Sequence, residues 1–222
     1  MKAGVIVFEG TNCDRETFRA LKASDFDVDY VWHDWTSLED YDMVVLPGGF
    51  SYGDYLRPGA IARFSPVMKS VERFVEENCG IVVGICNGFQ ILTESGLLPG
   101  AFLKNISGNF ICKMVNLEVE AHKVLADVEK LRLYIAHSDG NYVVDERTAE
   151  LLENEKRILF KYVDNPNGSV HSIAGVVNEK FNVFGMMPHP ERSAMPYHEN
   201  NDGLKVFKAM RRWLNERISR KA

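Results

Sequence analysis

The stretch IVVGICNGFQIL, residues 81–92, carries the two signals that decide how this chain folds. Residues 81–85 are an uninterrupted apolar run, which suits a strand buried on both faces of a parallel sheet. A helical pattern begins directly after Cys86, with Phe89 and Ile91 among its apolar residues. The stretch therefore predicts a strand, a sharp turn at Cys86 and a helix, like the turn that presents the serine of G-x-S-x-G proteins.

Gly84 and Gly88 stand two residues before and two residues after Cys86. Without Cβ atoms, they allow the strand and the helix to approach closely around a strained residue. A helix N-terminus also favours a thiolate and offers backbone N–H groups to a developing negative charge. These features make Cys86 a candidate nucleophile. From this motif alone, a buried cysteine that only packs remains the alternative, because most free cysteines are buried.

Strands and helices alternate around this stretch in the first half of the chain. Apolar runs predict strands at 4–8, 28–32 and 43–46, with helices at 14–22 and from residue 66 onward. This alternation is typical of an α/β fold with a doubly wound, mostly parallel sheet.

The second half has a different pattern. Six apolar runs read as strands, and helices are predicted only at 146–154 and 201–219; the runs are 110–120, 131–136, 142–144, 158–163, 173–178 and 183–187. We expect a mixed or antiparallel extension of the same sheet. No linker or repeat interrupts the chain, so residues 1–222 are predicted to form one domain.

Composition excludes several classes of protein. The chain has 222 residues, 45% of them hydrophobic and 26% charged, which is ordinary for a globular protein and not for a disordered one. Its net charge of −5 argues against a nucleic-acid partner. No apolar run approaches the ~18 residues of a membrane span. The apolar N-terminus is too short for a secretory signal and reads as a first strand, so we expect a cytoplasmic protein.

The four cysteines are Cys13, Cys79, Cys86 and Cys112. None are spaced as C-x2-C, so neither a zinc site nor a thioredoxin-like motif is predicted, and we expect no metal. In a reducing compartment the thiols should be free. We expect Cys79 and Cys112 to be packing residues. Cys13 follows the first strand at the same sheet edge as Cys86, where it could line the site or an interface.

A candidate base for Cys86 lies in the segment MMPHPE, residues 186–191. His189 follows an apolar strand and should emerge at the sheet edge where loops gather. Pro190 favours extended geometry at His189, and residues i and i+2 of an extended segment point the same way. Glu191 could therefore reach the imidazole and fix its tautomer. The three residues would form a Cys–His–Glu triad.

His137 is the rival base. It lies in the segment AHSDG, residues 136–140, and has the carboxylate of Asp139 two residues later. Spacing alone places His189 only modestly ahead of it.

The turn Pro47-Gly48-Gly49 ends the third predicted strand. A glycine pair there can direct a backbone N–H into the space above the neighbouring strand. Together with the N–H of Asn87 it could form a two-donor oxyanion hole. An ordinary tight turn would have the same sequence.

These motifs together resemble the class I (triad) glutamine amidotransferases, in both order and spacing. Longer stretches resemble the glutaminase subunits of phosphoribosylformylglycinamidine synthase (PurQ type), and the likeness covers nearly the whole chain; the stretches are 12–14, 30–33, 47–57, 173–178 and 185–192. Departures are small. Pro58 stands where the family has cysteine. Residues 136–140 keep the family's His-x-acid-Gly pattern but differ in its small and acidic residues, and residues 119–128 match least well.

The resemblance implies a flavodoxin-like doubly wound sheet and a role for each motif. Cys86 attacks the side-chain amide of glutamine, and Gly49 and Asn87 bind the oxyanion. His189 transfers protons and Glu191 orients it. Gly48 and Gln90 lie beside the bound glutamine, and His137 is left as part of the pocket wall.

The resemblance also implies partners. Ammonia would pass to a large synthetase subunit, helped by a small bridging subunit, which converts formylglycinamide ribonucleotide (FGAR) to formylglycinamidine ribonucleotide (FGAM) in de novo purine biosynthesis. The chain has neither G-x-x-x-x-G-K-[ST] nor G-x-G-x-x-G, so no cofactor is expected in it. ATP and Mg would belong to the synthetase.

Three alternatives remain at this point. A cysteine hydrolase of another kind, such as a peptidase or a stress-protein relative, would share Cys86 and a histidine. A non-catalytic module could keep the fold. A sibling glutaminase could serve another synthase, although residues 50–57 disfavour it.

Overall fold

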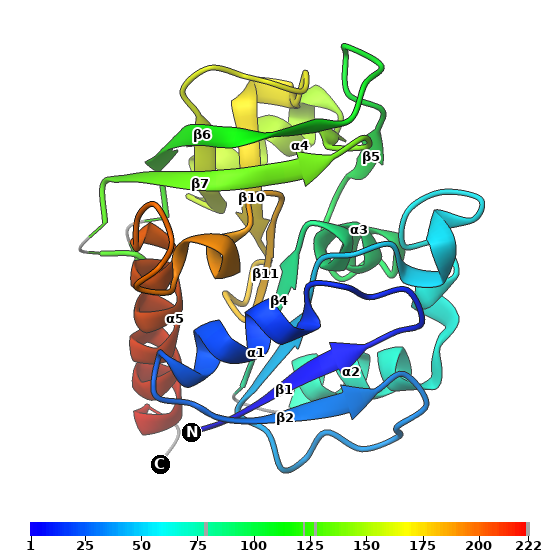
Figure 1. Ribbon diagram of the computed structural model, residues 1–222, viewed down its shortest axis with the longest axis vertical. Helices are drawn as coiled ribbons and strands as arrows, with labels where there is room; N and C mark the ends of the chain where they lie inside the picture. Colours follow the sequence, from blue (N-terminus) through cyan, green and yellow to red (C-terminus); the bar gives the residue numbers. More distant parts are fainter. Residues whose placement is uncertain (78–79, 122, 127, 221–222) are drawn as a thin grey trace.

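A nine-stranded sheet forms the centre of the structure, a computed structural model that describes residues 1–77, 80–121, 123–126 and 128–220. The strand order is β2-β1-β3-β4-β11-β10-β9-β6-β7 (Figure 1). The bounds are β1 (Lys2–Val7), β2 (Asp27–Trp32), β3 (Met43–Leu46), β4 (Ile81–Ile85), β6 (Ile111–Val119), β7 (Lys130–His137), β9 (Ile158–Tyr162), β10 (Ile173–Val177) and β11 (Val183–Met186).

The helices fall close to the predicted ranges: α1 (Asp14–Lys22), α2 (Pro66–Glu77), α3 (Asn87–Glu94), α4 (Glu146–Asn154) and α5 (Asp202–Ser219). α2 buries Val67, Val71, Phe74 and Val75, the face that its periodicity predicts. α4 begins at Asp145, whose side chain accepts a hydrogen bond from the backbone N–H of Thr148.

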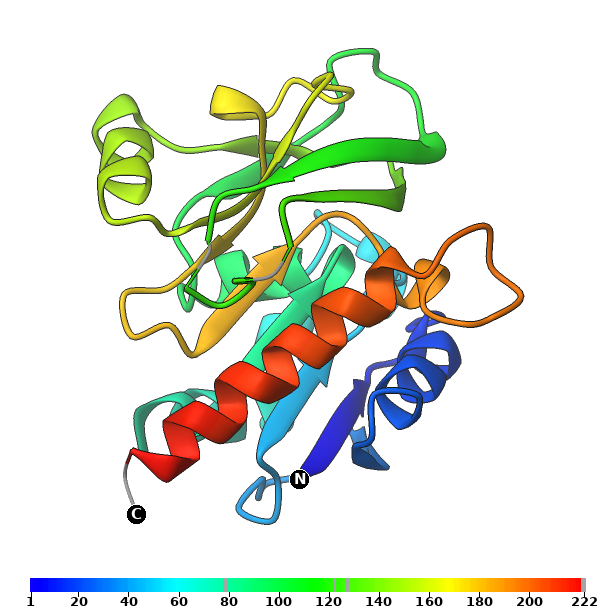
Figure 2. The same cartoon turned by 90° about the vertical axis from the view of Figure 1, so that its left-hand side faces the viewer.

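The first five strands in the order, β2-β1-β3-β4-β11, are all parallel to one another. β3, β4 and β11 are buried at every residue, which explains their continuous apolar sequences. α1 and α5 lie against each other on one face of this half, and α2 and α3 cover the other (Figures 1 and 2). The doubly wound α/β fold is confirmed.

The remaining strands, β10-β9-β6-β7, are antiparallel to their neighbours. The long β6–β7 hairpin crosses above the ends of the parallel strands (Figure 1). One predicted member of this extension lies elsewhere. β8 (Asn141–Val143) pairs with β5 (Ala101–Leu103) in a separate two-stranded sheet. β5 was not predicted.

The prediction that Cys112 is a packing residue is wrong, because its side chain is exposed. β6 pairs with β7 from Ile111 to Glu118, but with β9 only from Leu117 to Val119. The first half of β6, which contains Cys112, therefore extends beyond the stretch that pairs with β9. Cys79 lies outside the described residues. Within the part of the chain that is described, no helix is both long and apolar enough to cross a membrane.

Candidate active site

Cys86 lies at the turn between β4 and α3, where its backbone adopts φ 50° and ψ −105°. A positive φ is strained for a residue with a side chain, and nucleophile turns are among the sites where such strain is kept. The residue is 5% exposed. α3 begins at the next residue, so its free N–H groups surround the thiol.

The glycines on either side of Cys86 are required by close contacts. A Cβ at Gly84 would lie 2.6 Å from the backbone of Gly88, and one at Gly88 would lie 1.9 Å from the carbonyl oxygen of Leu46. Both distances are well inside van der Waals contact. The G-x-C-x-G spacing therefore lets α3 pack directly on the ends of β3 and β4.

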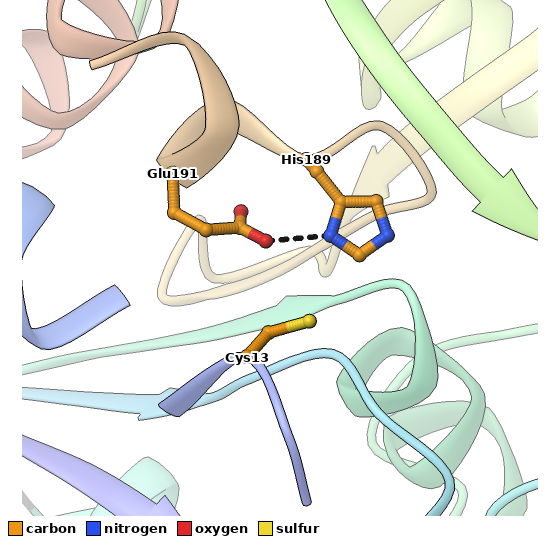
Figure 3. Close-up of side chains that lie close together, drawn as sticks. All are labelled: Cys13, His189 and Glu191. Atoms are coloured by element: carbon orange, nitrogen blue, oxygen red, sulfur yellow. Dashed lines mark hydrogen bonds and ion pairs between the residues drawn. The ribbon is translucent and has the colours of Figure 1, made fainter. Parts of the chain in front are cut away.

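His189 and Glu191 form a buried pair just after β11. Nδ1 of His189 lies 2.5 Å from Oε1 of Glu191, and the two side chains are almost fully buried (Figure 3). A carboxylate can only accept, so Nδ1 carries a proton and Nε2 is the ring nitrogen left to exchange a proton with another group. Nε2 has no hydrogen-bond partner among the described residues. The contact forms differently from the prediction, because Glu191 lies in a 3-10 turn (Pro190–Ser193) and not in an extended segment.

Burial is the largest single influence and disfavours the imidazolium form of His189, but the carboxylate of Glu191 and the thiols of Cys86 and Cys13 together outweigh it. The pKa of His189 is consequently held well above its usual value. The N–H of Cys86 donates to the carbonyl of Met186 at 2.7 Å, so the Cys86 turn lies beside the segment that leads to His189 and Glu191.

The backbone of β7 restrains this group. The N–H of His189 donates to the carbonyl of Tyr134 at 2.7 Å, and the Cys86 thiol donates to the carbonyl of Ala136 at 3.7 Å. No sequence pattern predicted either contact. A backbone carbonyl is offered by every residue type, so no sequence signal could have found them.

The Gly48–Gly49 turn lies beside the imidazole. A Cβ at Gly48 would be 2.7 Å from Cε1 of His189, and one at Gly49 would be 2.8 Å from the backbone nitrogen of Asn12. Gly49 has φ +150°, a conformation that side chains rarely adopt. Among the described residues, its N–H donates to no backbone carbonyl. It is therefore free to bind an anion.

Asn87 and Gln90 connect the Cys86 turn to two loops. Oδ1 of Asn87 accepts from the N–H of Ser51 at 3.1 Å, and Nδ2 donates to Oδ1 of Asp54 at 3.2 Å and to Oε1 of Gln90 at 3.1 Å. Nε2 of Gln90 then donates to the carbonyl of Asp139 at 2.7 Å. Both ends of the Gln90 amide are thus engaged within the protein. The sequence analysis did not assign Ser51 and Asp54 to the site, although it singled out their loop.

Asp54 is an unusual carboxyl in this network. Burial and the neighbouring Asp139 raise the pKa of Asp54 to about 6, and the hydrogen bond from Asn87 opposes them only in part. Its ionisation therefore falls close to physiological pH.

His137, the rival base, has a different environment. Burial, assisted by the nearby His189, lowers the pKa of His137 to about 4, so the ring is neutral near pH 7. Nδ1 pairs with Oδ1 of Asn105 at 3.0 Å, and the same oxygen accepts from the N–H of Gly140 at 3.1 Å. Nδ2 of Asn105 also donates to the carbonyl of His137 at 2.9 Å, so two hydrogen bonds to Asn105 hold this histidine in the wall of the site.

Cys13 also lies in the site. Its place after the first strand had left two locations open, the site or an interface. Its Sγ lies within 4.8 Å of ligand atoms of both His189 and Glu191, a set of donors that could hold a metal ion (Figure 3). Two contacts argue against a metal there. Nδ1 of His189 is engaged by Glu191, and Nη2 of Arg192 donates to Sγ of Cys13 at 3.2 Å, which places a positive charge beside the sulfur.

Comparison with known proteins agrees with this geometry. Residues 1–214 match the CobB/CobQ-like glutamine amidotransferase domain. The structure of PurLQS from Thermotoga maritima contains a chain that is 44% identical, with a TM-score of 0.87; the match covers 96% of this chain and 98% of that one.

Two more distant structures share the fold. A GMP synthase subunit protein from Thermoplasma acidophilum is 15% identical with a TM-score of 0.66, and the match covers 100% of this chain and 96% of that one. A glutamine amidotransferase from Thermotoga maritima is 18% identical with a TM-score of 0.58, over 99% and 83% of the two chains. Taken with the full-length likeness to the PurLQS chain, the matches show that this chain belongs to the CobB/CobQ-like glutamine amidotransferase family and, within it, to the PurQ type.

Proposed function

We propose that this chain hydrolyses glutamine to glutamate and ammonia through a Cys86 thioester, and that residues 1–222 act as one amidotransferase unit. Two neighbouring features support the proposal: the strained Cys86 turn at the end of β4 and the buried His189–Glu191 pair that follows the adjacent strand β11. A nucleophile, a base with a free nitrogen and a carboxylate that orients the base are the parts required for covalent acyl transfer.

In the first half of the reaction, Cys86 gives its proton to Nε2 of His189 and Sγ attacks the side-chain amide carbon of glutamine. The N–H groups of Gly49 and Asn87 stabilise the oxygen of the tetrahedral intermediate. His189 then protonates the amide nitrogen as the C–N bond breaks, which releases ammonia and leaves the thioester. Glu191 keeps the imidazole oriented throughout.

In the second half, His189 takes a proton from water, whose oxygen attacks the thioester carbon. Collapse of this intermediate breaks the C–S bond, returns the proton to Cys86 and releases glutamate. Gly48 and Gln90 are proposed to border the glutamine. Gln90 would shape the glutamine pocket through its hydrogen bond to the carbonyl of Asp139, which holds the Asp139 loop against the Cys86 turn.

The ammonia is proposed to pass to a large synthetase subunit that converts FGAR to FGAM with ATP and Mg, in a complex completed by a small bridging subunit. Support comes from the name of the 44% identical relative, PurLQS, which describes an assembly. Free ammonia would be lost to solvent and protonated, so complex formation should control activity. We expect weak glutamate release by the chain alone and strong activation in the complex.

The test is transfer of ammonia to FGAR by this chain with purified synthetase and bridging subunits, in the presence of ATP and Mg. FGAM formation from glutamine that stops with Cys86→Ala and resumes with added ammonium salt supports the proposal. Equal glutamate release with and without the partners would contradict the coupling. Cleavage of peptides or esters in place of glutamine would favour the other cysteine hydrolases.

A further inference from the structure

Arg192 follows Glu191 directly and extends toward the start of α1. Its Nη2 donates to Sγ of Cys13 at 3.2 Å, and its Nε lies 3.5 Å from Oε2 of Glu16 and 4.0 Å from Oε1 of Glu191. Burial alone would lower the pKa of Arg192, but Cys13, Glu191 and Glu16 together raise it. Arg192 therefore keeps its charge while it bridges the His189–Glu191 turn and α1.

Cys13 is 2% exposed and contacts the opposite side of the site. Its backbone N–H donates to the carbonyl of Gly48 at 3.2 Å. A Cβ built on Gly48 would lie 3.3 Å from Sγ of Cys13 and 2.7 Å from the ring of His189, so the three groups pack in one place. Figure 3 shows the Cys13 side chain pointing at the His189–Glu191 pair from the side opposite their own turn.

These contacts place Cys13 between the His189–Glu191 pair and the Gly48–Gly49 turn. Through its sulfur, Cys13 holds Arg192 and the turn that carries Glu191; through its backbone, it holds the turn of the Gly49 oxyanion donor. Glu191 is fully buried and its Oε2 has no hydrogen-bond partner among the described residues. The orientation of this carboxylate therefore depends on its single bond to His189 and on the backbone of its turn.

We propose that Cys13 and Arg192 are a positioning pair, which fixes the His189–Glu191 pair relative to the Gly48–Gly49 turn. The inference rests on the proposed function and adds two residues to it, which act by positioning His189 and Glu191. A displacement of about 1 Å by a residue outside the chemistry can cost about 10²-fold in rate, so the pair should act on kcat and leave glutamine binding unchanged.

The first test measures glutamate release in the assembled complex. We expect Cys13→Ala and Arg192→Met each to lower kcat about 10-fold or more, with the KM for glutamine within about twofold of wild type. Cys13→Ser keeps a small hydrogen-bond acceptor and should restore most of kcat. The double variant should be no slower than Arg192→Met, because the two residues act as one unit. Cys112→Ala, the loss of an exposed thiol, is the matched control.

The second test does not depend on turnover. Cys13→Ala should loosen the His189–Glu191 contact, and it also removes the thiol that itself raises the pKa of His189, so NMR titration of the imidazole should show a lower pKa. Arg192→Met keeps the thiol and removes a positive charge, which alone would raise this pKa, so a lower pKa in that variant as well reports the loosened contact. A substitution that only destabilised the fold would lower Tm and leave this pKa unchanged.

The possible failures are distinguishable. An unchanged His189 pKa and unchanged kcat in both single variants would overturn the positioning pair, while glutamate release by wild type would leave the proposed function standing. Effects of Cys13→Ala and Arg192→Met that multiply in the double variant would also overturn it. Conversely, a wild-type complex that releases no glutamate would remove the proposed function, and the titration would still decide whether Cys13 positions His189. If Arg192→Met does not fold, Cys13→Ala and Cys13→Ser carry the comparison.

Discussion

The parallel and antiparallel halves of the sheet contribute to the site in different ways. The parallel half supplies side chains and strained backbone at strand ends: Cys86 after β4, the glycine turn after β3 and His189 after β11. The antiparallel half supplies backbone carbonyls from Tyr134 and Ala136 of β7. The first kind of contribution needs particular residues, and the second needs only that β7 be held in place.

Because of this difference, substitutions in the two halves should differ in their effects on activity and on stability. Changes at the parallel strand ends should affect the chemistry with little change in stability. Changes in the antiparallel half should affect the site only through stability, or through polar residues that hold β7. Five substitutions test this division, from the largest expected effect to the smallest.

Cys86→Ala removes the nucleophile and should reduce glutamate release by about 10⁴-fold or more, while Tm stays within a few degrees of wild type. Labelling by a glutamine-analogue electrophile such as 6-diazo-5-oxonorleucine should disappear as well. Cys112→Ala, in the antiparallel half, should keep full activity. Labelling at Cys13 in place of Cys86 would show that the nucleophile is misassigned.

Glu191→Gln should lower kcat by about 10²–10⁴-fold, because an amide can present the wrong hydrogen-bonding group to Nδ1 of His189. It also removes the charge that raises the pKa of His189. The limb of the pH–rate profile that reports the imidazolium should consequently move to lower pH. A full pH–rate profile checks this, with the exposed Glu150→Gln as control. A limb that moved to higher pH would contradict the proposed pairing.

Gly49→Ala should lower kcat by about 10²–10³-fold, the usual cost of losing an oxyanion donor. The new Cβ would lie 2.8 Å from the backbone nitrogen of Asn12 at a φ of +150°, so the turn must move. Gly96→Ala is the control, because Gly96 also has a positive φ of +75° but open space around it. Equal kcat values for the two variants would remove Gly49 from the oxyanion hole.

Asn105→Ala tests the antiparallel half. Asn105 is buried, accepts from the N–H of Gly140 and donates to the carbonyl of His137 at 2.9 Å, so its loss leaves several buried polar groups unpaired near the end of β7. We expect a loss of roughly 2 kcal/mol, or about 4–8 °C in Tm by calorimetry. The exposed Asn154→Ala should change neither Tm nor activity. A large fall in kcat with an unchanged Tm would show that this half participates directly in the chemistry.

The smallest effect is expected for Asp54→Asn. Because the folded-state pKa of Asp54 is raised to about 6, its carboxyl favours the folded state below pH ~4, and this contribution is lost as the pH rises through 6. The amide cannot ionise, so the variant should gain stability over wild type at pH 7.5 but not at pH 4. After allowance for solvent screening, about 1 kcal/mol or 2–4 °C in Tm is expected. Thermal melts at the two pH values measure the difference, and a gain at pH 4 alone would contradict the assignment.

The sequence predicted the parallel half well because each part has a local signature. Continuous apolar runs identify β3 and β4, and the glycines around Cys86 reflect the contact with Leu46. The His189–Glu191 contact was predicted from an alternation that the 3-10 turn does not have, and spacing alone could not exclude His137. Only the fold shows that His137 is buried, paired with Asn105 and neutral.

The antiparallel half was predicted less completely. The short β5 and the pairing of β8 escaped detection, and Cys112 in β6 was expected to be buried. Whether a strand is covered depends on how far its neighbours extend, and no window of sequence contains that information. The same holds for Arg192, whose contact with Cys13 joins residues 179 positions apart.

The pairing of β4 with β11 has a consequence for how the protein loses activity. Their register places Gly84 opposite Gly185 and Ile85 opposite Met186, and the N–H of Cys86 continues the ladder to the carbonyl of Met186 at 2.7 Å. The separation of Cys86, the proposed nucleophile, from the segment that carries His189, the proposed base, is thus set by the spacing of adjacent strands, in the most buried part of the sheet. We expect amides here to exchange with solvent only when the whole sheet opens. Heat inactivation should therefore follow global unfolding and show no earlier, local step.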